Sequence, residues 1–115
     1  MFLPFTVAVD FDGTLCENAW PNIGAPKMDM INYLISQQRT GWKLILWTCR
    51  SGAQLDEAVR WCKTHGLVFD AVNKNLPERV KHFGDDPRKI GADAYLDDHN
   101  AFIHRISEKP QILYP

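Results

Sequence analysis

Two aspartates, Asp10 and Asp12, are the residues of this sequence best suited to chemistry, and they lie in the segment Asp10-Phe11-Asp12-Gly13-Thr14. In an extended backbone, residues i and i+2 point to the same side, so both carboxylates can face one site while Phe11 turns inward. Two neighbouring carboxyl groups can divide the work of a hydrolysis, one as nucleophile and one as general acid and base. Four fixed residues give roughly one chance match per thousand chains of this size, so a structural turn alone does not explain the pattern.

A second acidic pair, Asp97-Asp98, follows another apolar run late in the chain. Converging carboxylates repel one another unless a cation neutralises them, and an all-oxygen set of ligands selects a hard cation. We therefore expect Mg²⁺, with water and a substrate phosphate completing its octahedron. Lys89, shortly before the same run, is a candidate positive counterpart. A single loop aspartate is more often a turn former or a helix cap, and for Asp98 alone this simpler role stays open.

The elements that must position these residues follow from the apolar runs. Short apolar runs predict five strands, over residues 5–9, 42–47, 67–72, 93–96 and 111–114. Apolar residues at helical spacing predict a helix from Met28 that stops at Gly41, and a second that begins at a Ser51–Gln54 capping box and ends at Gly66. Two shorter helices are expected over residues 77–83 and 101–106. Residues 11–26 are expected to form a long structured loop.

Strands and helices alternate along the chain, which favours a mainly parallel sheet with helices on both faces. We therefore predict an α/β fold: a single domain over residues 1–115, built as a Rossmann-like three-layer α/β/α sandwich with about five strands. Ligands of such sheets bind beyond the carboxyl ends of the strands. Asp10, Thr48, Asp97 and Asp98 all stand at predicted strand ends.

Composition narrows the classes of protein. The 115 residues carry 13 Lys and Arg against 14 Asp and Glu, a formal net charge of −1, so nucleic acid and anionic membranes are not indicated as partners. The three cysteines include no Cys-x-x-Cys pair, which argues against a disulfide framework and a structural zinc site. No basic leader or apolar stretch of roughly 18 residues is present, so we expect a cytoplasmic protein without a membrane partner.

Residues 7–15 (VAVDFDGTL) resemble the first motif of the haloacid dehalogenase (HAD) superfamily, whose members are mostly Mg²⁺-dependent phosphatases. The resemblance extends over nearly the whole chain. Thr48, at the end of LILWT, is similar to the second motif, a Ser or Thr that binds the phosphoryl group, and Asp97-Asp98 resemble the acidic fourth motif. The third motif is a lysine with little sequence around it: Lys89 suits it by position, and Lys74 is the alternative.

The resemblance implies a mechanism for these positions. Asp10 would attack phosphorus and form an aspartyl-phosphate, and Asp12 would protonate the leaving oxygen and later activate water. Mg²⁺ would be held by Asp10, Asp97 and the Asp12 main-chain carbonyl, while Thr48 and Lys89 bind the phosphoryl group. Arg50 could also reach a substrate phosphate or carboxylate, although a surface arginine near a helix start explains it equally well.

The length of the chain bears on the substrate. Residues 16–27 and 50–89 leave no room for the separately folded cap that many HAD relatives carry. Capless relatives often act on large substrates or use a neighbouring subunit as cover, so the resemblance allows a homo-oligomer. The expected substrate is a phosphorylated small molecule or the phosphorylated end of a larger one. Trp20, in the loop after the first motif, could stack on a substrate, although a tryptophan that anchors the loop is the more frequent finding. His99 is a candidate for the rim of the site.

Two other classes of protein are compatible with a small α/β domain. A receiver-like signalling module also carries an aspartyl-phosphate, but it places its acidic pair and its phosphoacceptor on different strands. A binding domain without turnover is the other class, and the candidates for all four HAD motifs argue against it. We therefore predict a capless HAD-like phosphatase, a phosphoric monoester hydrolase.

Overall fold

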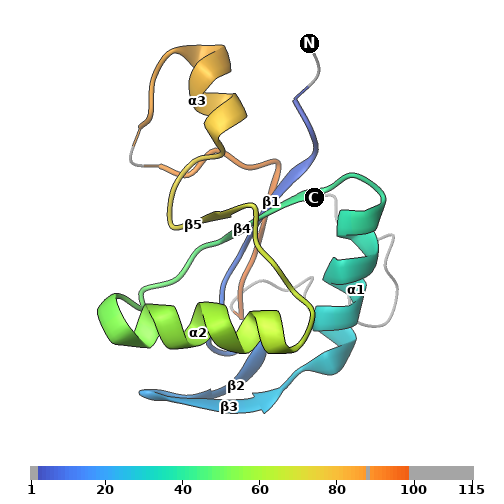
Figure 1. The fold of residues 1–115 in the computed structure, drawn as a ribbon, viewed down its shortest axis with the longest axis vertical. Coiled ribbons are helices and arrows are strands. Elements are labelled where there is room, and N and C mark those ends of the chain that lie inside the picture. Colours follow the sequence, from blue (N-terminus) through green and yellow to red (C-terminus); the bar gives the residue numbers. More distant parts are fainter. Residues whose placement is uncertain (1–2, 88, 99–115) are drawn as a thin grey trace.

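The structure of the protein, a computed structural model, describes residues 3–87 and 89–98. Within them the chain forms one mixed α/β domain with a four-stranded parallel sheet, in the order β5-β4-β1-β6, and a separate antiparallel hairpin of β2 and β3 (Figure 1). The strands are β1 (Thr6–Val9), β2 (Cys16–Ala19), β3 (Asn22–Pro26), β4 (Lys43–Leu46), β5 (Ala71–Val72) and β6 (Ala94–Leu96). The helices are α1 (Met28–Arg39), α2 (Gly52–Thr64) and α3 (Pro77–Phe83).

β1 is a central strand of the sheet, and all four of its residues are buried. A strand in this position has neighbours on both edges and elements on both faces, which is why its sequence is a continuous apolar run. Val9, its last residue, is in register with Leu46 of β4 and Leu96 of β6. Because all three strands are parallel and end in register, the residues that follow them meet at one edge of the sheet.

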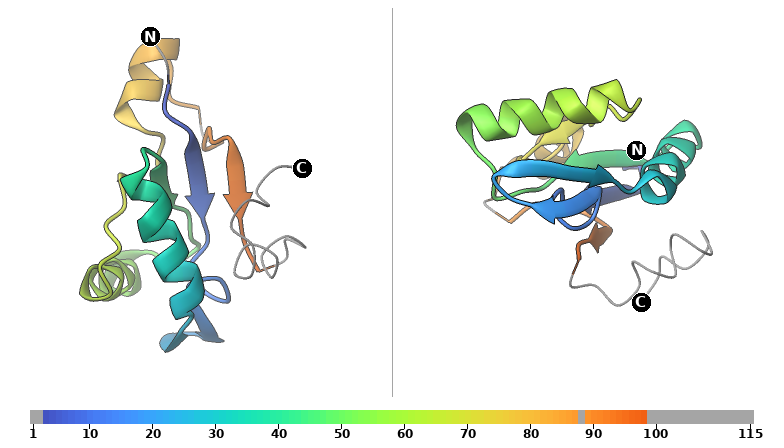
Figure 2. Two further views of the ribbon diagram at one scale, coloured as in Figure 1. Left: turned by 90° about the vertical axis from the view of Figure 1, so that its right-hand side faces the viewer. Right: turned by 90° about the horizontal axis from the view of Figure 1, so that it is seen from below.

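Alternate residues of β1 face two different apolar clusters. Val7 and Val9 belong to a cluster that includes Leu34 of α1 and Ala58 of α2. Figure 2 shows these two helices on the same side of the sheet. Ala8 faces the other way, into a smaller cluster completed by residues on either side of α3, Leu76 and Ile90. α3 lies at one end of the molecule and the β2–β3 hairpin at the other (Figures 1 and 2).

Most of the expected elements are confirmed. The parallel sheet, the helix from Met28, the helix after Ser51 and the helix over residues 77–83 are present. The strand expected over residues 67–72 is reduced to Ala71 and Val72. Asp70 explains part of this difference, because its side chain accepts a hydrogen bond from the Leu44 amide at 2.8 Å, where a strand would offer a main-chain oxygen. Ser51 stands at the helix start, but its side chain makes no capping hydrogen bond, so the predicted capping box is wrong.

The main correction concerns residues 11–26, which were expected to be a loop. Residues 16–26 form the β2–β3 hairpin, with Asn18 opposite Ile23 and Ala19 opposite Asn22. The hairpin turn consists of Trp20 and Pro21, which are joined by a cis peptide bond. The helix expected over residues 101–106, the strand over 111–114 and His99 lie outside the described residues. In the part of the chain that is described, no helix has the length and apolar character needed to cross a membrane.

Candidate functional site

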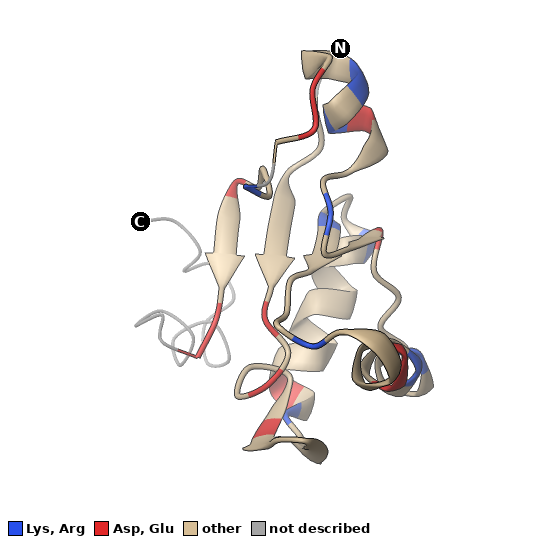
Figure 3. Ribbon diagram, turned by 90° about the vertical axis from the view of Figure 1, so that its left-hand side faces the viewer, with Lys and Arg blue, Asp and Glu red and all other residues tan. Residues whose placement is uncertain are grey.

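The carboxyl ends of three strands bring together the acidic residues singled out in the sequence. The Asp10 amide donates to the Leu96 carbonyl at 2.8 Å, which joins the end of β1 to the end of β6. On the other side, the Trp47 amide donates to the Val9 carbonyl at 2.8 Å and joins β4 to β1. Acidic segments follow the arrowheads of both β1 and β6 in Figure 3. The predicted convergence of these strand ends is therefore present.

The turn after β1 is tight and packs against β6. The Leu15 amide donates to the Phe11 carbonyl at 2.9 Å, and Phe11 itself is fully buried. Gly13 has a φ of +86°, which favours glycine, and a Cβ atom built on it would lie only 2.5 Å from Asp98 Oδ2. Lys27 Nζ holds the turn from the other side by donating to the Gly13 carbonyl at 2.9 Å. The turn and the second acidic pair are thus in direct contact.

Asp10 carries the clearest electrostatic sign of a functional site. Its pKa is raised from 3.8 to about 6, chiefly because burial disfavours the charged form. The amide of Phe11 opposes this by hydrogen bonding to the carboxylate, whereas Asp98, Asp12 and Asp97 raise the pKa further by charge repulsion. Among these three neighbours Asp98 has the largest effect. Four carboxyl groups therefore act on one another at this end of the sheet.

Asp12 is in a different environment from Asp10, because it forms a bidentate ion pair with Arg50. Arg50 Nε donates to Asp12 Oδ2 at 2.9 Å, and Arg50 Nη2 donates to Asp12 Oδ1 at 2.7 Å. Arg50 is only 2% exposed, and its hydrogen bonds to Asp12 raise the pKa of the guanidinium. The structure thus contradicts the alternative of a surface arginine, and it places the charged end of Arg50 against Asp12.

Thr48 lies at the end of β4 as expected, and a residue that sequence reasoning missed fixes its backbone. Asn73 Oδ1 accepts from the Thr48 amide at 2.8 Å, while the Asn73 amide donates to Leu46 at 2.7 Å. Asn73 has a φ of +52°, a conformation that asparagine tolerates better than most residues. Thr48 Oγ1 accepts from the Arg50 amide at 3.1 Å, and a hydroxyl that accepts can still donate its own proton to an anion. An asparagine directly after a strand was the available signal.

The two candidate lysines differ in their place relative to the sheet. Lys74 follows the carboxyl end of β5 by two residues, and so belongs to the same edge as Asp10. Lys89 lies a few residues before β6. Asp93, just before the same strand, is hydrogen-bonded to Thr6 at the beginning of β1: its amide donates to the Thr6 carbonyl, and its carboxylate accepts from the Thr6 amide. Lys89 therefore belongs to the amino-terminal end of the sheet. The structure corrects the preference for Lys89 and favours Lys74.

The donor set suits a hard cation, although it is not a closed metal cage. Among the described residues, no three His, Cys, Asp or Glu side chains are arranged to hold a metal ion together. Asp10, Asp97 and Asp98 nevertheless supply carboxylates whose mutual repulsion raises the pKa of Asp10. Mg²⁺ commonly uses one or two carboxylates and takes its remaining ligands from water and a phosphate. The Asp12 side chain is occupied by Arg50, so only its main-chain carbonyl fits the predicted metal role.

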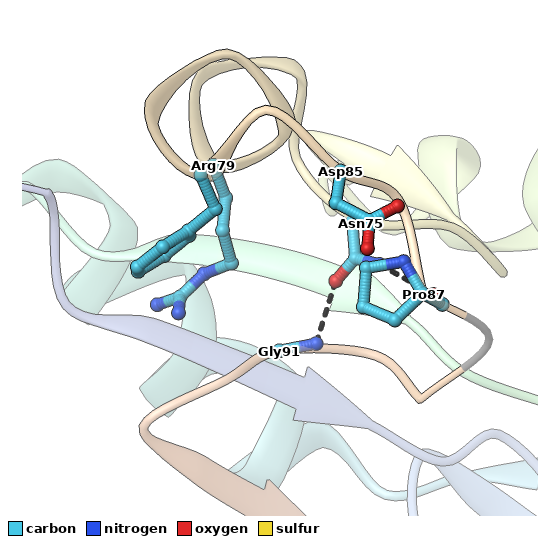
Figure 4. Close-up of a pocket in the computed structure, with 6 residues that line it drawn as sticks. Asn75, Arg79, Asp85, Pro87 and Gly91 are labelled. Carbon is cyan, nitrogen blue, oxygen red and sulfur yellow. Dashed lines mark hydrogen bonds between the residues drawn. The ribbon is translucent and has the colours of Figure 1, made fainter.

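A cavity of about 390 Å³ lies away from these residues, between α3 and the segment that leads to β6 (Figure 4). Asn75 supports one wall by accepting from the Gly91 amide at 2.6 Å and donating to Asp86 at 2.9 Å. Arg79 also lines the cavity, with its Nε buried and without a hydrogen-bond partner among the described residues. None of the predicted catalytic or metal-binding residues lines this cavity.

Two of the three cysteines, Cys16 and Cys62, lack the features of nucleophiles. Burial raises the pKa of Cys62 to about 12 and also raises that of Cys16. A thiol needs to be a thiolate to attack, so both are core residues in this fold. The three cysteines, Cys16, Cys49 and Cys62, are free thiols in the structure.

Comparison with known proteins places the chain in a family. The fold and site define a mixed α/β protein with an acidic cluster at the carboxyl edge of a parallel sheet. A conserved protein of Bacteroides thetaiotaomicron has a similar solved structure, with a TM-score of 0.78 and 41% sequence identity over 92% of this chain and 88% of that one. The chain therefore belongs to the same family as this Bacteroides protein. No protein-family model and no curated protein matches the chain.

Proposed function

We propose that the protein is a phosphatase of the HAD superfamily, a capless Rossmann-like domain that hydrolyses a phosphate monoester with Mg²⁺. The main support is the position of Asp10, at the junction of β1, β4 and β6, with the charges of Asp12, Asp97 and Asp98 around it. A carboxylate in this position can act as a nucleophile once a cation offsets its neighbours. Bound Mg²⁺ would supply that charge compensation and would also orient the substrate phosphate.

The reaction divides between the two aspartates. An Asp10 oxygen attacks phosphorus, a new oxygen–phosphorus bond forms, and the bond to the leaving oxygen breaks, which gives an aspartyl-phosphate and an alcohol. Asp12 gives the leaving oxygen its proton, then takes a proton from the water that attacks the same phosphorus. Hydrolysis returns the Asp10 carboxylate and releases inorganic phosphate. Thr48 and Lys74 hold the phosphoryl oxygens during both steps.

The proposed substrate is a phosphorylated small molecule or a phosphorylated end of a larger one. The β2–β3 hairpin is continuous with the turn that carries Asp12 and lies near the same end of the sheet. It is too small to enclose a substrate by itself, because each strand has only four or five residues. This supports an open site, covered by the substrate itself or by another copy of the chain. We also propose that the protein is cytoplasmic.

A receiver-like or silent binding domain is the alternative. In a receiver-like module the acidic pair and the phosphoacceptor follow different strands, whereas Asp10 and Asp12 both follow β1. The proposed enzyme turns over its aspartyl-phosphate, and the alternative holds it or never forms it. Repeated release of phosphate therefore separates the two functions.

The test is hydrolysis of p-nitrophenyl phosphate by the purified protein with and without Mg²⁺. We expect multiple turnovers with Mg²⁺, loss of activity in EDTA, and at least a thousandfold lower kcat/KM in Asp10→Asn, as is usual when a covalent nucleophile is removed. Asp56→Asn is the matched control, because Asp56 is an exposed aspartate of α2. Equal activity of Asp10→Asn and Asp56→Asn would rule out the assignment of the nucleophile.

A further inference from the structure

Arg50 is bound to more than the proposed general acid. Its Nη2 donates to the Asn22 carbonyl at 2.9 Å in addition to Asp12, and its Nη1 donates to the Pro21 carbonyl at 3.2 Å. Pro21 belongs to the hairpin turn, and Asn22 is the first residue of β3. The Arg50 guanidinium therefore bridges the Asp12 carboxylate and the turn of the β2–β3 hairpin. Arg50 and Asp12 are 38 residues apart in the sequence.

Aromatic rings shield this bridge from water. The guanidinium lies 5.0 Å from the centre of the Phe11 ring, which is fully buried, and 4.9 Å from the centre of the Trp20 ring, which is 57% exposed. Both contacts are within the range of cation–π attraction. A charged pair is stronger where water is excluded, so the Trp20 ring helps to keep Arg50 on Asp12. Lifting the hairpin turn would remove the Trp20 ring and two carbonyl partners together.

The bridge has a consequence for proton transfer. Both oxygens of Asp12 accept a hydrogen bond from Arg50, which fixes the direction of the carboxyl group and leaves each oxygen a second lone pair for a proton. When one oxygen leaves Arg50, the other bond still keeps the carboxyl group aimed. A planar fork suits this exchange, because one of two parallel bonds can break while the second holds the direction.

We infer that Arg50 is a positioning residue, which aims the Asp12 carboxyl group at the leaving oxygen. Because Arg50 also binds the hairpin turn, the position of this turn controls the release of an Asp12 oxygen from Arg50. The inference rests on the proposed function for the proton-transfer step. The link between Asp12, Arg50 and the hairpin is structural and can be tested without any activity. Trp20 contributes to the same positioning, because its ring covers the Asp12–Arg50 ion pair and moves away with the hairpin turn.

The kinetic test compares two substrates that differ in their need for a general acid. p-Nitrophenolate leaves with little protonation, whereas phenolate is a poorer leaving group and depends more on Asp12. We expect Arg50→Lys to lower kcat/KM for phenyl phosphate about tenfold more than for p-nitrophenyl phosphate, and Trp20→Ala to act in the same direction with a smaller difference. Arg60→Lys, at an exposed arginine of α2, is the matched control. Equal losses on both esters in the Arg50 and Trp20 variants would overturn the positioning role.

The structural test is amide hydrogen exchange of residues 16–26. We expect faster exchange in Arg50→Lys, because lysine lacks the guanidinium fork that donates to the Pro21 and Asn22 carbonyls. We also expect it in Asp12→Asn, because the guanidinium loses the carboxylate that holds it beneath the hairpin turn. Amides of β1 and β4 are the internal reference and should keep their protection if the domain stays folded. Unchanged hairpin exchange in Asp12→Asn would overturn the bridge, whatever the kinetics show. If the wild type hydrolyses neither ester, the proposed function fails while the exchange result still decides the bridge. If Arg50→Lys does not fold, Trp20→Ala and Asp12→Asn decide both parts.

Discussion

Asp10 and Asp12 are only two residues apart, but their negative charges are balanced in opposite ways. The Asp12 carboxylate has a buried arginine on both oxygens, whereas Asp10 is surrounded by other carboxylates and has a raised pKa. An internal cation thus fixes one acid, and the other is left for a cation or phosphoryl group from outside. This difference supports distinct roles for the two residues, with Asp10 as the reacting group and Asp12 as the aimed proton carrier.

Among the changes that test this comparison, we expect the largest loss of kcat/KM when the positive charge of Lys74 near Asp10 is removed. Because Lys74 follows β5 at the carboxyl edge and Lys89 precedes β6 at the opposite edge, Lys74→Ala should lower kcat/KM about a hundredfold or more. Lys89→Ala should change it less than about threefold, which makes it the matched control for loss of one positive charge. Steady-state hydrolysis of p-nitrophenyl phosphate measures both variants. A larger loss in Lys89→Ala would restore the original preference for that residue.

Titration of Asp10 should respond to added metal. Without metal its carboxyl group should titrate at about 6, above the ordinary 3.8, because of burial and the neighbouring carboxylates. Mg²⁺ favours the charged form, so its addition should move the titration to lower pH. Carbon-detected NMR of the aspartate carboxyl groups, with Asp10→Asn for assignment, measures both values. A titration of Asp10 that Mg²⁺ leaves in place would contradict a metal site at this residue.

The contact between the two acidic segments should appear in stability. Gly13→Ala forces an alanine to a φ of +86° and brings its Cβ within 2.5 Å of Asp98, so we expect a loss of about 2–3 kcal/mol. Gly84→Ala is the control, since Gly84 has a φ of +71° with no atom near the added Cβ, and should cost about 1 kcal/mol. Urea unfolding of both variants gives the comparison. Equal losses would show that the turn does not press against Asp98.

The smallest effect is a gain in stability when Asp10 is neutralised. Its pKa is higher in the folded chain (about 6) than its ordinary value of 3.8, so the folded state binds this proton more tightly. The ionisation of Asp10 therefore lowers the free energy of unfolding of the wild type as pH rises from about 4 to about 6. Above pH 6 this reduction stays constant. Asp10→Asn should melt a few degrees higher than the wild type at pH 7.5 in EDTA, with the gap closing near pH 4. A lower melting temperature at pH 7.5 would contradict the unfavourable charge.

Patterns within one element allowed much of the fold to be predicted. β1 was found because a strand covered on both faces is apolar throughout, and Asp10 was placed at its end because the apolar run stops there. The helix over residues 77–83 was found from Pro77, which suits a first helical turn. These signals lie in neighbouring residues, so the sequence alone carries them.

Contacts between distant elements account for what could not be predicted. The strand Cys16–Ala19 has one buried residue and three exposed ones, so it lacks the alternation of a half-buried strand. Its hairpin is held by Arg50, which lies 28 residues beyond Asn22. The role of Arg50 itself depends on Asp12, and the choice between the two lysines depends on which edge of the sheet each one follows. Spacing in the sequence does not encode these relations.

Chemical trapping of the phosphorylated residue tests directly whether Asp10 accepts the phosphoryl group. The wild type is mixed with p-nitrophenyl phosphate and Mg²⁺, quenched during turnover, reduced with borohydride and mapped by peptide mass spectrometry. Reduction of an aspartyl-phosphate gives homoserine, and we predict homoserine at position 10 in the wild type and none there in Asp10→Asn. Homoserine at another aspartate, or steady hydrolysis with no reducible residue, would contradict Asp10 as the phosphoryl acceptor.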